Sequence, residues 1–301
     1  MYFDKVTILG VGLIGASFGL AIKAKGLSKT IVGYGRSENN LRRAKEQGII
    51  DAYSMDAGRA CEGADLIVLA TPVGILKRLV GDIAGSIKAG AIITDVGSVK
   101  GVVYDLEPLL PEGVFYVGSH PIAGSDQSGI DEARADLFSG ARCILTPTEN
   151  SHRPAMQKIA SLWEQFGSRV EFLDPRKHDR IYAAVSHLPH ILAYALVDAV
   201  HDFGADCIEY AGQGFKDTTR IALSSPELWR DICIFNKDNL SSLMGILQEH
   251  LDRIRALLVA GDASGVEKEF SRAQRLRMML SDEGRRSAAN GADSITADGG
   301  L

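Results

Sequence analysis

The chain has 301 residues, of which 46% are hydrophobic and 24% charged, and this length is enough for two globular domains with packed cores. A formal net charge of −5 and a pI near 5.8 argue against a nucleic-acid-binding protein, which would normally carry a basic stripe. Four well-separated cysteines, no secretory leader and no uninterrupted apolar stretch of membrane-spanning length favour a cytoplasmic protein that binds neither nucleic acid nor membrane.

The first strand-like run, Lys5–Leu9, leads into a glycine turn and then a helical pattern. Strand, glycine turn and helix in this order form the fingerprint of a dinucleotide-binding site. The first glycine allows a tight turn, the second allows the pyrophosphate to approach, and the third lets the helix pack on the strand. The unpaired N–H groups at the helix start then face the phosphates. We expect the cofactor at Gly10, Gly12, Leu13, Ile14 and Gly15.

The second strand-like run, Thr30–Tyr34, ends about 20 residues beyond this turn, where an acidic residue normally binds the ribose 2′-hydroxyl. Arg36 and Ser37 stand there instead. A guanidinium pairs with a phosphate through two parallel hydrogen bonds, so these residues suit the 2′-phosphate of NADP. The alternative is that Arg36 is a solvated loop charge and that Glu38 reaches back to the ribose. The sequence therefore predicts NAD or NADP, with NADP accepted.

Two buried parallel strands are expected next, at Ala64–Ala70 and Ala91–Asp95, because both runs are almost continuously apolar. Thr71 and Pro72 close the first of them with a turn, at the edge where the nicotinamide half of the cofactor should pass. Strands alternate with helices through this half of the chain. This alternation predicts an α/β fold with a doubly wound, mostly parallel Rossmann-type sheet.

One titratable imidazole, His120, stands among small residues in the segment Gly118-Ser-His-Pro-Ile-Ala-Gly-Ser125. We interpret this segment as a shaped loop after a strand, because Pro121 fixes φ and the glycines permit unusual backbone angles. Ser98 suits the cap of a helix from about Val99, and its hydroxyl can also serve a ligand and His120. A lone histidine is usually structural, but open α/β sheets bind ligands at this edge, which favours a catalytic His120.

The strand pattern stops after Ser168–Leu173, and long helical patterns replace it. We predict a dinucleotide-binding Rossmann domain over residues 1–173. An all-helical substrate and dimerisation domain is expected over residues 174–280. Residues 281–301 are rich in glycine, alanine and serine, and this composition predicts a disordered tail.

The helical half contains His187 and His190, three residues apart on roughly one helical face. Pro189 between them implies a kink or a restart of the helix. No carboxylate or cysteine accompanies them at ligand spacing, so we expect no metal and place one or both histidines at a ligand pocket. Two later helices, about Lys237–Leu258 and Ala263–Leu280, have apolar faces suited to packing on a second copy of the chain.

Four motifs, met in this order along the chain, together resemble the prephenate dehydrogenase family, which includes cyclohexadienyl and arogenate dehydrogenases of tyrosine biosynthesis. The resemblance covers about Lys5 to Leu280. It implies NAD(P)-dependent oxidative decarboxylation of prephenate to 4-hydroxyphenylpyruvate, or of arogenate to tyrosine, by a homodimer joined through the helical domain. The motifs are the Gly10–Gly15 turn, Asp95-Val-Gly-Ser98-Val-Lys100, Ser119-His-Pro-Ile-Ala-Gly-Ser125, and His178-Asp179 followed by Ser186-His-Leu-Pro-His190.

The resemblance also implies roles for single residues. The histidine that matches His120 accepts the hydrogen bond of the ring hydroxyl, and the serine that matches Ser98 assists it. The arginine that matches Arg220 binds a substrate carboxylate, and a dianionic substrate does need a cation that can grip a carboxylate with two hydrogen bonds. The other pocket residues implied by the resemblance are Ser125, His190 and Trp229.

Several alternatives remain open at this point. Prephenate and arogenate differ only in a keto or an amino group on the side chain, and the sequence does not separate them. No C-terminal sensor domain is seen in the sequence, so we expect that any feedback by tyrosine would act at the active site itself. One rival is a two-domain dehydrogenase of 3-hydroxy acids, which would use a lysine in place of His120. Another is a catalytically silent dinucleotide sensor, which would not need His120, Ser98 and Arg220 together.

Overall fold

The computed structural model describes residues 3–124 and 129–293. The chain divides into two compact units, residues 1–241 and 242–301. The first unit holds the whole sheet and the helices up to α10. No strand follows residue 173 in the described part of the chain, so the strand pattern ends where the sequence predicted a domain boundary.

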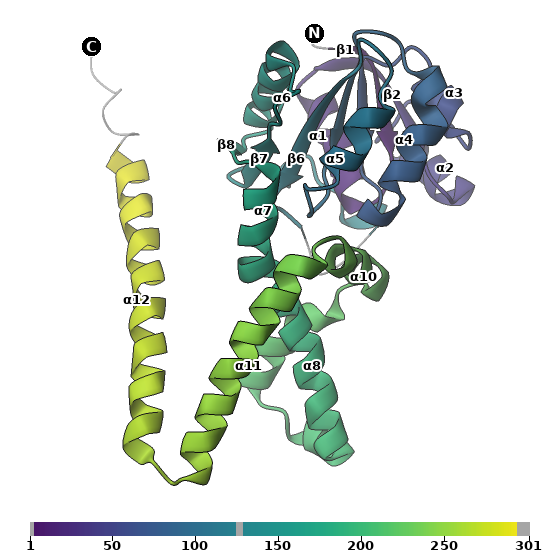
Figure 1. The fold of residues 1–301 in the computed structure, drawn as a ribbon. Helices are drawn as coiled ribbons and strands as arrows, with labels where there is room; N and C mark the ends of the chain where they lie inside the picture. Colours follow the sequence, from purple (N-terminus) through teal and green to yellow (C-terminus); the bar gives the residue numbers. More distant parts are fainter. Residues whose placement is uncertain (1–2, 125–128, 294–301) are drawn as a thin grey trace. The chain divides into compact units, whose positions relative to one another are not determined.

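An eight-stranded sheet forms the centre of the first unit (Figure 1), with the strand order β3-β2-β1-β4-β5-β6-β7-β8. All neighbouring strands run parallel except β6 and β7. The order reverses between β1 and β4, which creates a ligand-binding crevice at their carboxyl ends. The predicted doubly wound, mostly parallel fold is confirmed. The strands are β1 (Phe3–Leu9), β2 (Ser28–Tyr34), β3 (Ala52–Ser54), β4 (Leu66–Leu69), β5 (Ile92–Asp95), β6 (Phe115–Pro121), β7 (Arg142–Thr146) and β8 (Arg169–Phe172).

Helices and loops connect the strands, and helices follow the last strand. The α-helices are α1 (Leu13–Ala24), α2 (Glu38–Glu46), α3 (Ala57–Cys61), α4 (Leu76–Ile83), α5 (Val103–Leu106), α6 (Arg153–Gln165), α7 (Pro175–Tyr182), α8 (Leu188–Phe203), α9 (Gln213–Thr219), α10 (Pro226–Phe235), α11 (Lys237–Val259) and α12 (Ala263–Asp293). Short 3₁₀ turns are η1 (Val73–Ile75), η2 (Ala84–Ser86), η3 (Glu107–Leu109), η4 (Ile130–Glu132), η6 (Ala205–Tyr210) and η7 (Arg220–Leu223), and η5 (Ala183–His187) is a π-helical turn.

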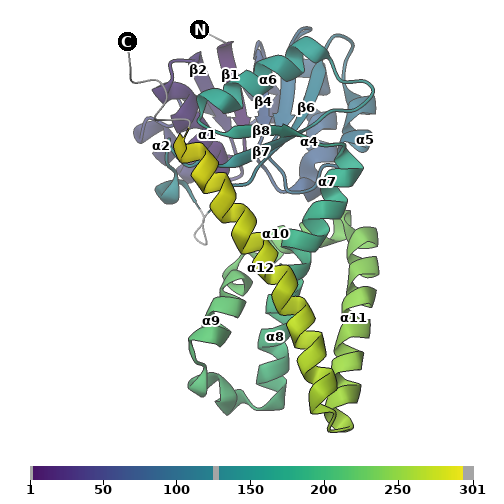
Figure 2. The same cartoon turned by 90° about the vertical axis from the view of Figure 1, so that its left-hand side faces the viewer.

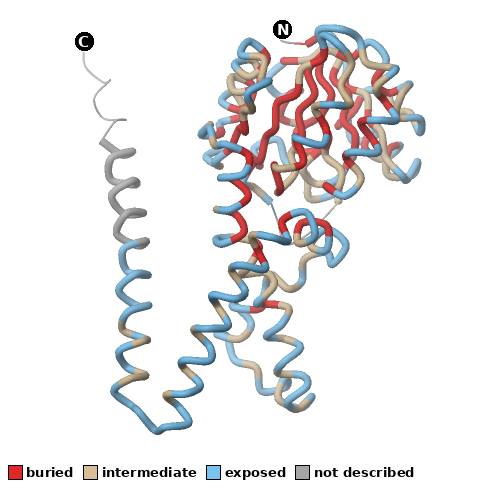
Figure 3. The backbone as a smooth tube through the Cα atoms, in the orientation of Figure 1, coloured by how far each residue is buried: buried red, intermediate tan, exposed pale blue. Residues whose placement is uncertain are grey.

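The core of the first unit lies on both faces of the sheet, because successive strand residues point to opposite sides. In β4, Leu66 and Val68 join the cluster that includes α1, α2 and α6, whereas Ile67 and Leu69 join the cluster that includes α3, α4 and α5. Figure 3 shows that the buried residues concentrate in these strands. Trp163 of α6 is fully buried in the first cluster and donates a hydrogen bond to Ser119 Oγ at 3.2 Å, which anchors β6 beside His120.

Helices α7 and α8 form one continuous helical stretch, Pro175–Phe203, joined by η5 (Figure 2). Pro189 lacks the N–H that would form a hydrogen bond within an α-helix. The π-helical turn just before it accommodates the missing hydrogen bond, and the helix continues. By length and composition this stretch could cross a membrane, whereas the sequence showed no uninterrupted apolar run of that length. Only 17% of the apolar window in this stretch is buried within the described structure, and the stretch carries His178 and His187, which are both buried and hydrogen-bonded.

The second unit consists of the helices α11, from residue 242 onward, and α12. Helix α12 continues to Asp293, past Leu280, where the sequence predicted that a disordered tail begins. Large apolar side chains are exposed along both helices, as expected of surfaces that become buried in an assembly. They include Met244, Ile246, Leu251, Leu258, Val259, Phe270 and Leu276.

Candidate active site

The glycine turn between β1 and α1 has the shape that a dinucleotide requires. Gly10 has a φ of 105°, and a Cβ there would lie 2.5 Å from the carbonyl oxygen of Ala70. A Cβ on Gly15 would collide with the carbonyl oxygen of Gly10. Around Gly12, in contrast, nothing lies within 4 Å of the position that a Cβ would take, so the backbone is open to a ligand. Two glycines thus shape the turn and one leaves room for the phosphates.

The neighbouring groups also fit a dinucleotide. Leu13 and Ile14 begin α1, and no side chain caps this helix end, so its first N–H groups are available to an anion. Thr71 follows β4 on the other side of the crevice, and its Oγ1 is buried without a hydrogen-bond partner in the described part of the chain. An unsatisfied buried hydroxyl is costly, so it suits a polar ligand group. Pro72 precedes η1 at the same edge.

Arg36 and Ser37 lie at the end of β2, as predicted, but they have partners within the protein. Arg36 Nη1 lies 3.9 Å from Glu227 Oε1, and 82% of the Arg36 side chain is exposed. Ser37 Oγ accepts a hydrogen bond from the N–H of Asn40 at 3.3 Å and so caps α2. The arginine is accessible to a 2′-phosphate, whereas the serine already has a structural role.

His120 lies within β6 and not in a loop, contrary to the sequence-based interpretation. The strand continues to Pro121 because its last residues pair with β7, with His120 opposite Ile144. The absence of an N–H on Pro121 does not break this pairing, and the next N–H, from Ile122, bonds to Arg142 O at 2.7 Å. His120 therefore sits on a rigid element at the carboxyl edge of the parallel strands, with 8% of its surface exposed.

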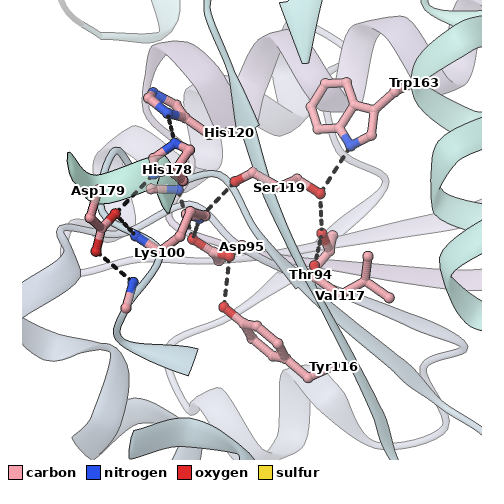
Figure 4. Close-up of polar contacts among 12 residues, drawn as sticks. Thr94, Asp95, Lys100, Tyr116, Val117, Ser119, His120, Trp163, His178 and Asp179 are labelled. Atoms are coloured by element: carbon pink, nitrogen blue, oxygen red, sulfur yellow. Dashed lines mark hydrogen bonds and ion pairs between the residues drawn. The ribbon is translucent and has the colours of Figure 1, made fainter. Parts of the chain in front are cut away.

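The loop after β5, which carries Ser98, is held by a buried ion pair (Figure 4). Lys100 Nζ contacts Asp95 Oδ2 and donates to the carbonyl oxygen of Ser119 at 2.7 Å. Tyr116 donates to Asp95 Oδ1 at 2.6 Å, and burial raises the pKa of this phenol well above its usual value. Because Ser119 precedes His120, this cluster ties the Ser98 loop to the strand that carries His120.

Ser98 does not cap a helix at Val99, as the sequence suggested, because α5 begins only at Val103. The N–H groups of Lys100 and Gly101 instead donate to the two carboxylate oxygens of Asp179, each at 2.7 Å. Backbone groups that would have started a helix are therefore bound by a side chain from α7. Ser98 stays half-buried in a non-helical loop at the same sheet edge as His120.

His178 and Asp179 are part of the site, although the sequence-based list of site residues omitted them. His120 Nδ1 lies 2.8 Å from His178 Nε2, and His178 Nδ1 lies 2.8 Å from Asp179 Oδ1. The ring of Tyr182, one turn along α7, contacts both imidazoles, with centroids 4.9 Å from His120 and 4.4 Å from His178. The adjacent His-Asp pair at a helix start was the signal in the sequence.

The electrostatics of the site keep His120 uncharged at neutral pH. Burial lowers the pKa of His120 well below 6.5, and the nearby His178, Lys100 and His187 lower it further. Burial also lowers the pKa of His178, against the opposing effect of Asp179. A neutral imidazole can accept a proton, so His120 is suited to act as a base.

A pocket of about 540 Å³ in the first unit contains two of the predicted substrate-binding residues, His190 and Arg220. His190 Nδ1 lies 2.9 Å from Ser186 O, and its ring stacks on Trp229 with centroids 3.5 Å apart. His120 does not line this pocket, and Ser125 lies outside the described residues. The described residues that line it are Gly124, Glu132, Arg134, Leu137, His190, Arg220, Ile221 and Ser224.

His187, the other histidine of the pair, does not line that pocket. Its side chain is fully buried, and Asn236 Nδ2 lies 3.0 Å from its Nδ1. Burial lowers the pKa of His187 to about 4. Asn236 also donates to the carbonyl oxygen of Asp179 at 2.8 Å, so His187 contributes to packing behind the His178-Asp179 pair.

A Rossmann sheet with an open glycine turn and a buried neutral histidine at the same edge defines a dehydrogenase that uses a nicotinamide dinucleotide. Residues 18–172 match the model of the prephenate dehydrogenase nucleotide-binding domain, and residues 174–272 match that of the prephenate dehydrogenase dimerization domain. The chain belongs to the prephenate dehydrogenase family, which confirms the resemblance seen in the sequence.

Individual relatives cover nearly the whole chain. A cyclohexadienyl dehydrogenase of Zymomonas mobilis is 33% identical over 92% of this chain and 96% of its own. A prephenate dehydrogenase of Bacillus subtilis is 34% identical over 91% of this chain and 75% of its own. The crystal structure of prephenate dehydrogenase from Aquifex aeolicus with hydroxyphenyl propionate and NAD+ has a TM-score of 0.87 at 33% identity, covering 93% of this chain and 99% of that one.

Proposed function

We propose that this chain oxidises and decarboxylates prephenate to 4-hydroxyphenylpyruvate, with His120 as the base and Arg220 as the anchor of a substrate carboxylate. The observation that carries the proposal is a neutral His120, fixed on a strand at the edge where the glycine turn opens. Relatives that act on prephenate support this substrate. The match to a dimerization domain and the exposed apolar helices support a homodimer.

The chemistry needs a base because a ring hydroxyl must lose its proton as the carbon that bears it is oxidised. A nicotinamide dinucleotide, when bound, accepts the hydride from that carbon. His120 takes the hydroxyl proton on Nε2, and the C–O bond becomes a carbonyl. Loss of the ring carboxylate as carbon dioxide then sends its electron pair through the ring to this oxygen, and His120 returns the proton to form the phenol. The aromatic product makes the reaction effectively one-way.

Each remaining residue has a part in holding the substrate. Ser98 offers a second polar contact to the ring hydroxyl, while Arg220 and His190 line the pocket that would receive a carboxylate and the side chain. Trp229 supports His190 by stacking. Ser125 is proposed to complete the side-chain end. The phosphates would lie against Gly10, Gly12, Leu13, Ile14 and Gly15, with Thr71 and Pro72 on the nicotinamide side.

The substrate is tested by steady-state rates with prephenate and with arogenate, each with NAD and with NADP. We expect turnover of prephenate with release of one carbon dioxide for each reduced cofactor. A higher kcat/KM with arogenate than with prephenate would mean that arogenate is the substrate. Absence of turnover with both substrates and both cofactors, in a protein that still binds the dinucleotide, would identify a silent sensor and refute the proposal.

Any inhibition by tyrosine is expected to be competitive with the substrate.

The use of NADP depends on Arg36 in this proposal. The Arg36→Ala variant should lose affinity for NADP by about 10- to 100-fold, because a charge-assisted contact to the 2′-phosphate disappears. The KM for NAD should change little. Arg42→Ala removes another exposed arginine, on α2, and serves as the matched control. Equal KM values for NADP in the parent and in Arg36→Ala would mean that Arg36 only pairs with Glu227.

A further inference from the structure

The hydrogen bonds behind His120 form a directed chain, His120 to His178 to Asp179 (Figure 4). All three side chains are buried, with 8%, 0% and 5% of their surfaces exposed. The chain starts on β6 and ends on α7, and the first two residues are separated by 58 positions in the sequence.

The direction of each hydrogen bond follows from the acceptor at the end of the chain. Asp179 accepts from the N–H of Lys100 and of Gly101, one on each oxygen, as an ionised carboxylate does. His178 Nδ1, which faces the Asp179 carboxylate, must therefore carry a hydrogen and donate it. A neutral imidazole has one donor and one acceptor, so His178 Nε2 is the acceptor. His120 must then donate from Nδ1, and its Nε2 keeps the free electron pair.

We propose that His178 and Asp179 are positioning residues that fix the tautomer of His120 and so present its Nε2 as the base. This inference rests on the proposed function, because it explains how His120 is prepared for the reaction proposed there. The hydrogen bond that the His120 ring makes within residues 3–124 and 129–293 uses Nδ1, which leaves Nε2 for the substrate. When His120 takes up the substrate proton, its Nδ1–H remains bonded to His178, and the Asp179 carboxylate stabilises the new positive charge.

Other groups around His120 do not supply this effect. Lys100 Nζ is directed at Asp95 and at the carbonyl oxygen of Ser119, and its positive charge opposes the imidazolium. His187 bonds to Asn236, and its influence on the pKa of His120 is also a lowering one. Tyr182 contacts His120 with its ring, at 4.9 Å between centroids. Among the described residues, only the His178-Asp179 pair accepts from the His120 ring.

Two substitutions of His178 separate positioning from simple packing. In His178→Gln, the side-chain amide reaches the position of His178 Nε2, so it can still accept a hydrogen bond from His120. In His178→Asn, the shorter amide reaches only the position of His178 Nδ1, so it can contact Asp179 but not His120. If positioning matters, His178→Asn should lower kcat by about 10- to 100-fold, the usual effect of losing a hydrogen bond to a charged group. His178→Gln should keep a kcat about tenfold or more above that of His178→Asn, with similar KM values for prephenate in both variants.

The tautomer itself is measured by long-range ¹⁵N–¹H NMR of the ligand-free full chain, in which the His120 signals are assigned by their loss in His120→Asn. We expect the proton on Nδ1 of His120 in the parent and a mixture of tautomers in His178→Asn. This readout depends on the hydrogen-bond chain and not on global stability. Thermal denaturation of both variants establishes that they are folded.

Two results would overturn the inference. One is a kcat for His178→Asn equal to or above that of His178→Gln, which would mean that the contact with Asp179 matters only for packing. The other is an Nε2–H proton on His120 in the parent. Failure of the proposed function is recognised separately, because the parent would then turn over neither prephenate nor arogenate, while the NMR measurement would still report the tautomer.

Discussion

The His120→Asn variant should lose about 10²- to 10⁴-fold in kcat, the range expected when a positioned base is removed. The asparagine amide takes the place of Nδ1, so it can still donate to His178 Nε2, and the fold should persist. What disappears is the ring nitrogen that faces the substrate. Affinity for the dinucleotide, measured by titration of protein fluorescence, should remain that of the parent, because His120 lies outside the glycine turn.

His152→Asn is the matched control for this variant. His152 stacks on Phe115, with centroids 3.8 Å apart, at the start of α6 and outside the site. The His152→Asn variant should keep the kcat of the parent. A His120→Asn variant with more than about a tenth of the parental kcat would exclude His120 as the base, since even a weak base contributes more.

The pH profile of kcat gives a second reading of the same residue. Burial and the neighbours His178, Lys100 and His187 lower the pKa of His120, so the neutral base persists as the pH falls below 6.5. Activity should therefore stay level through pH 6.5 and decline only as the pH falls through the lower folded-state pKa. An acid limb centred above 6.5 would mean that another group controls the rate.

The parts of this molecule that could be predicted from sequence are those that depend on near neighbours. The Gly10–Gly15 turn depends on the glycines of one short segment. The apolar runs that form β4 and β5 can also be predicted from short segments, because every residue of a buried parallel strand is in apolar surroundings. The residues themselves pointed to His120 and to the pair His187 and His190, and the family resemblance added Arg220. The structure brings His190 and Arg220 to one pocket and places His120 on the adjoining sheet edge.

The parts that could not be predicted depend on contacts between distant residues. Asp179 lies 78 to 79 positions from Gly101 and Lys100, and its carboxylate takes the N–H groups that a helix after Ser98 would have used. The pairing of β6 with β7 likewise decides that His120 is on a strand. Glycine and proline near His120 indicate a loop only if no partner strand is available, and the sequence does not show the register.

Arg220→Gln should lower kcat/KM for prephenate by about 10- to 100-fold, because the substrate carboxylate would lose its charged hydrogen-bond donor. Most of the change should appear in KM, since the carboxylate side chain is bound alike before and during the reaction. Arg220→Lys keeps the charge but loses the second parallel hydrogen bond, so its kcat/KM should fall between that of the parent and that of Arg220→Gln. Steady-state kinetics of the three proteins at one ionic strength makes the comparison.

Arg134 provides the control, because it lines the same pocket but its Nε lies 3.3 Å from Asp136 Oδ1. The substrate carboxylate is proposed to bind Arg220 and not Arg134, so Arg134→Gln should reduce kcat/KM less than Arg220→Gln. Arg220 and His190 line this pocket together, and the pKa of His190 is lowered by burial first and also by the charge of Arg220. A larger loss for Arg134→Gln would move the carboxylate site to the other side of the pocket.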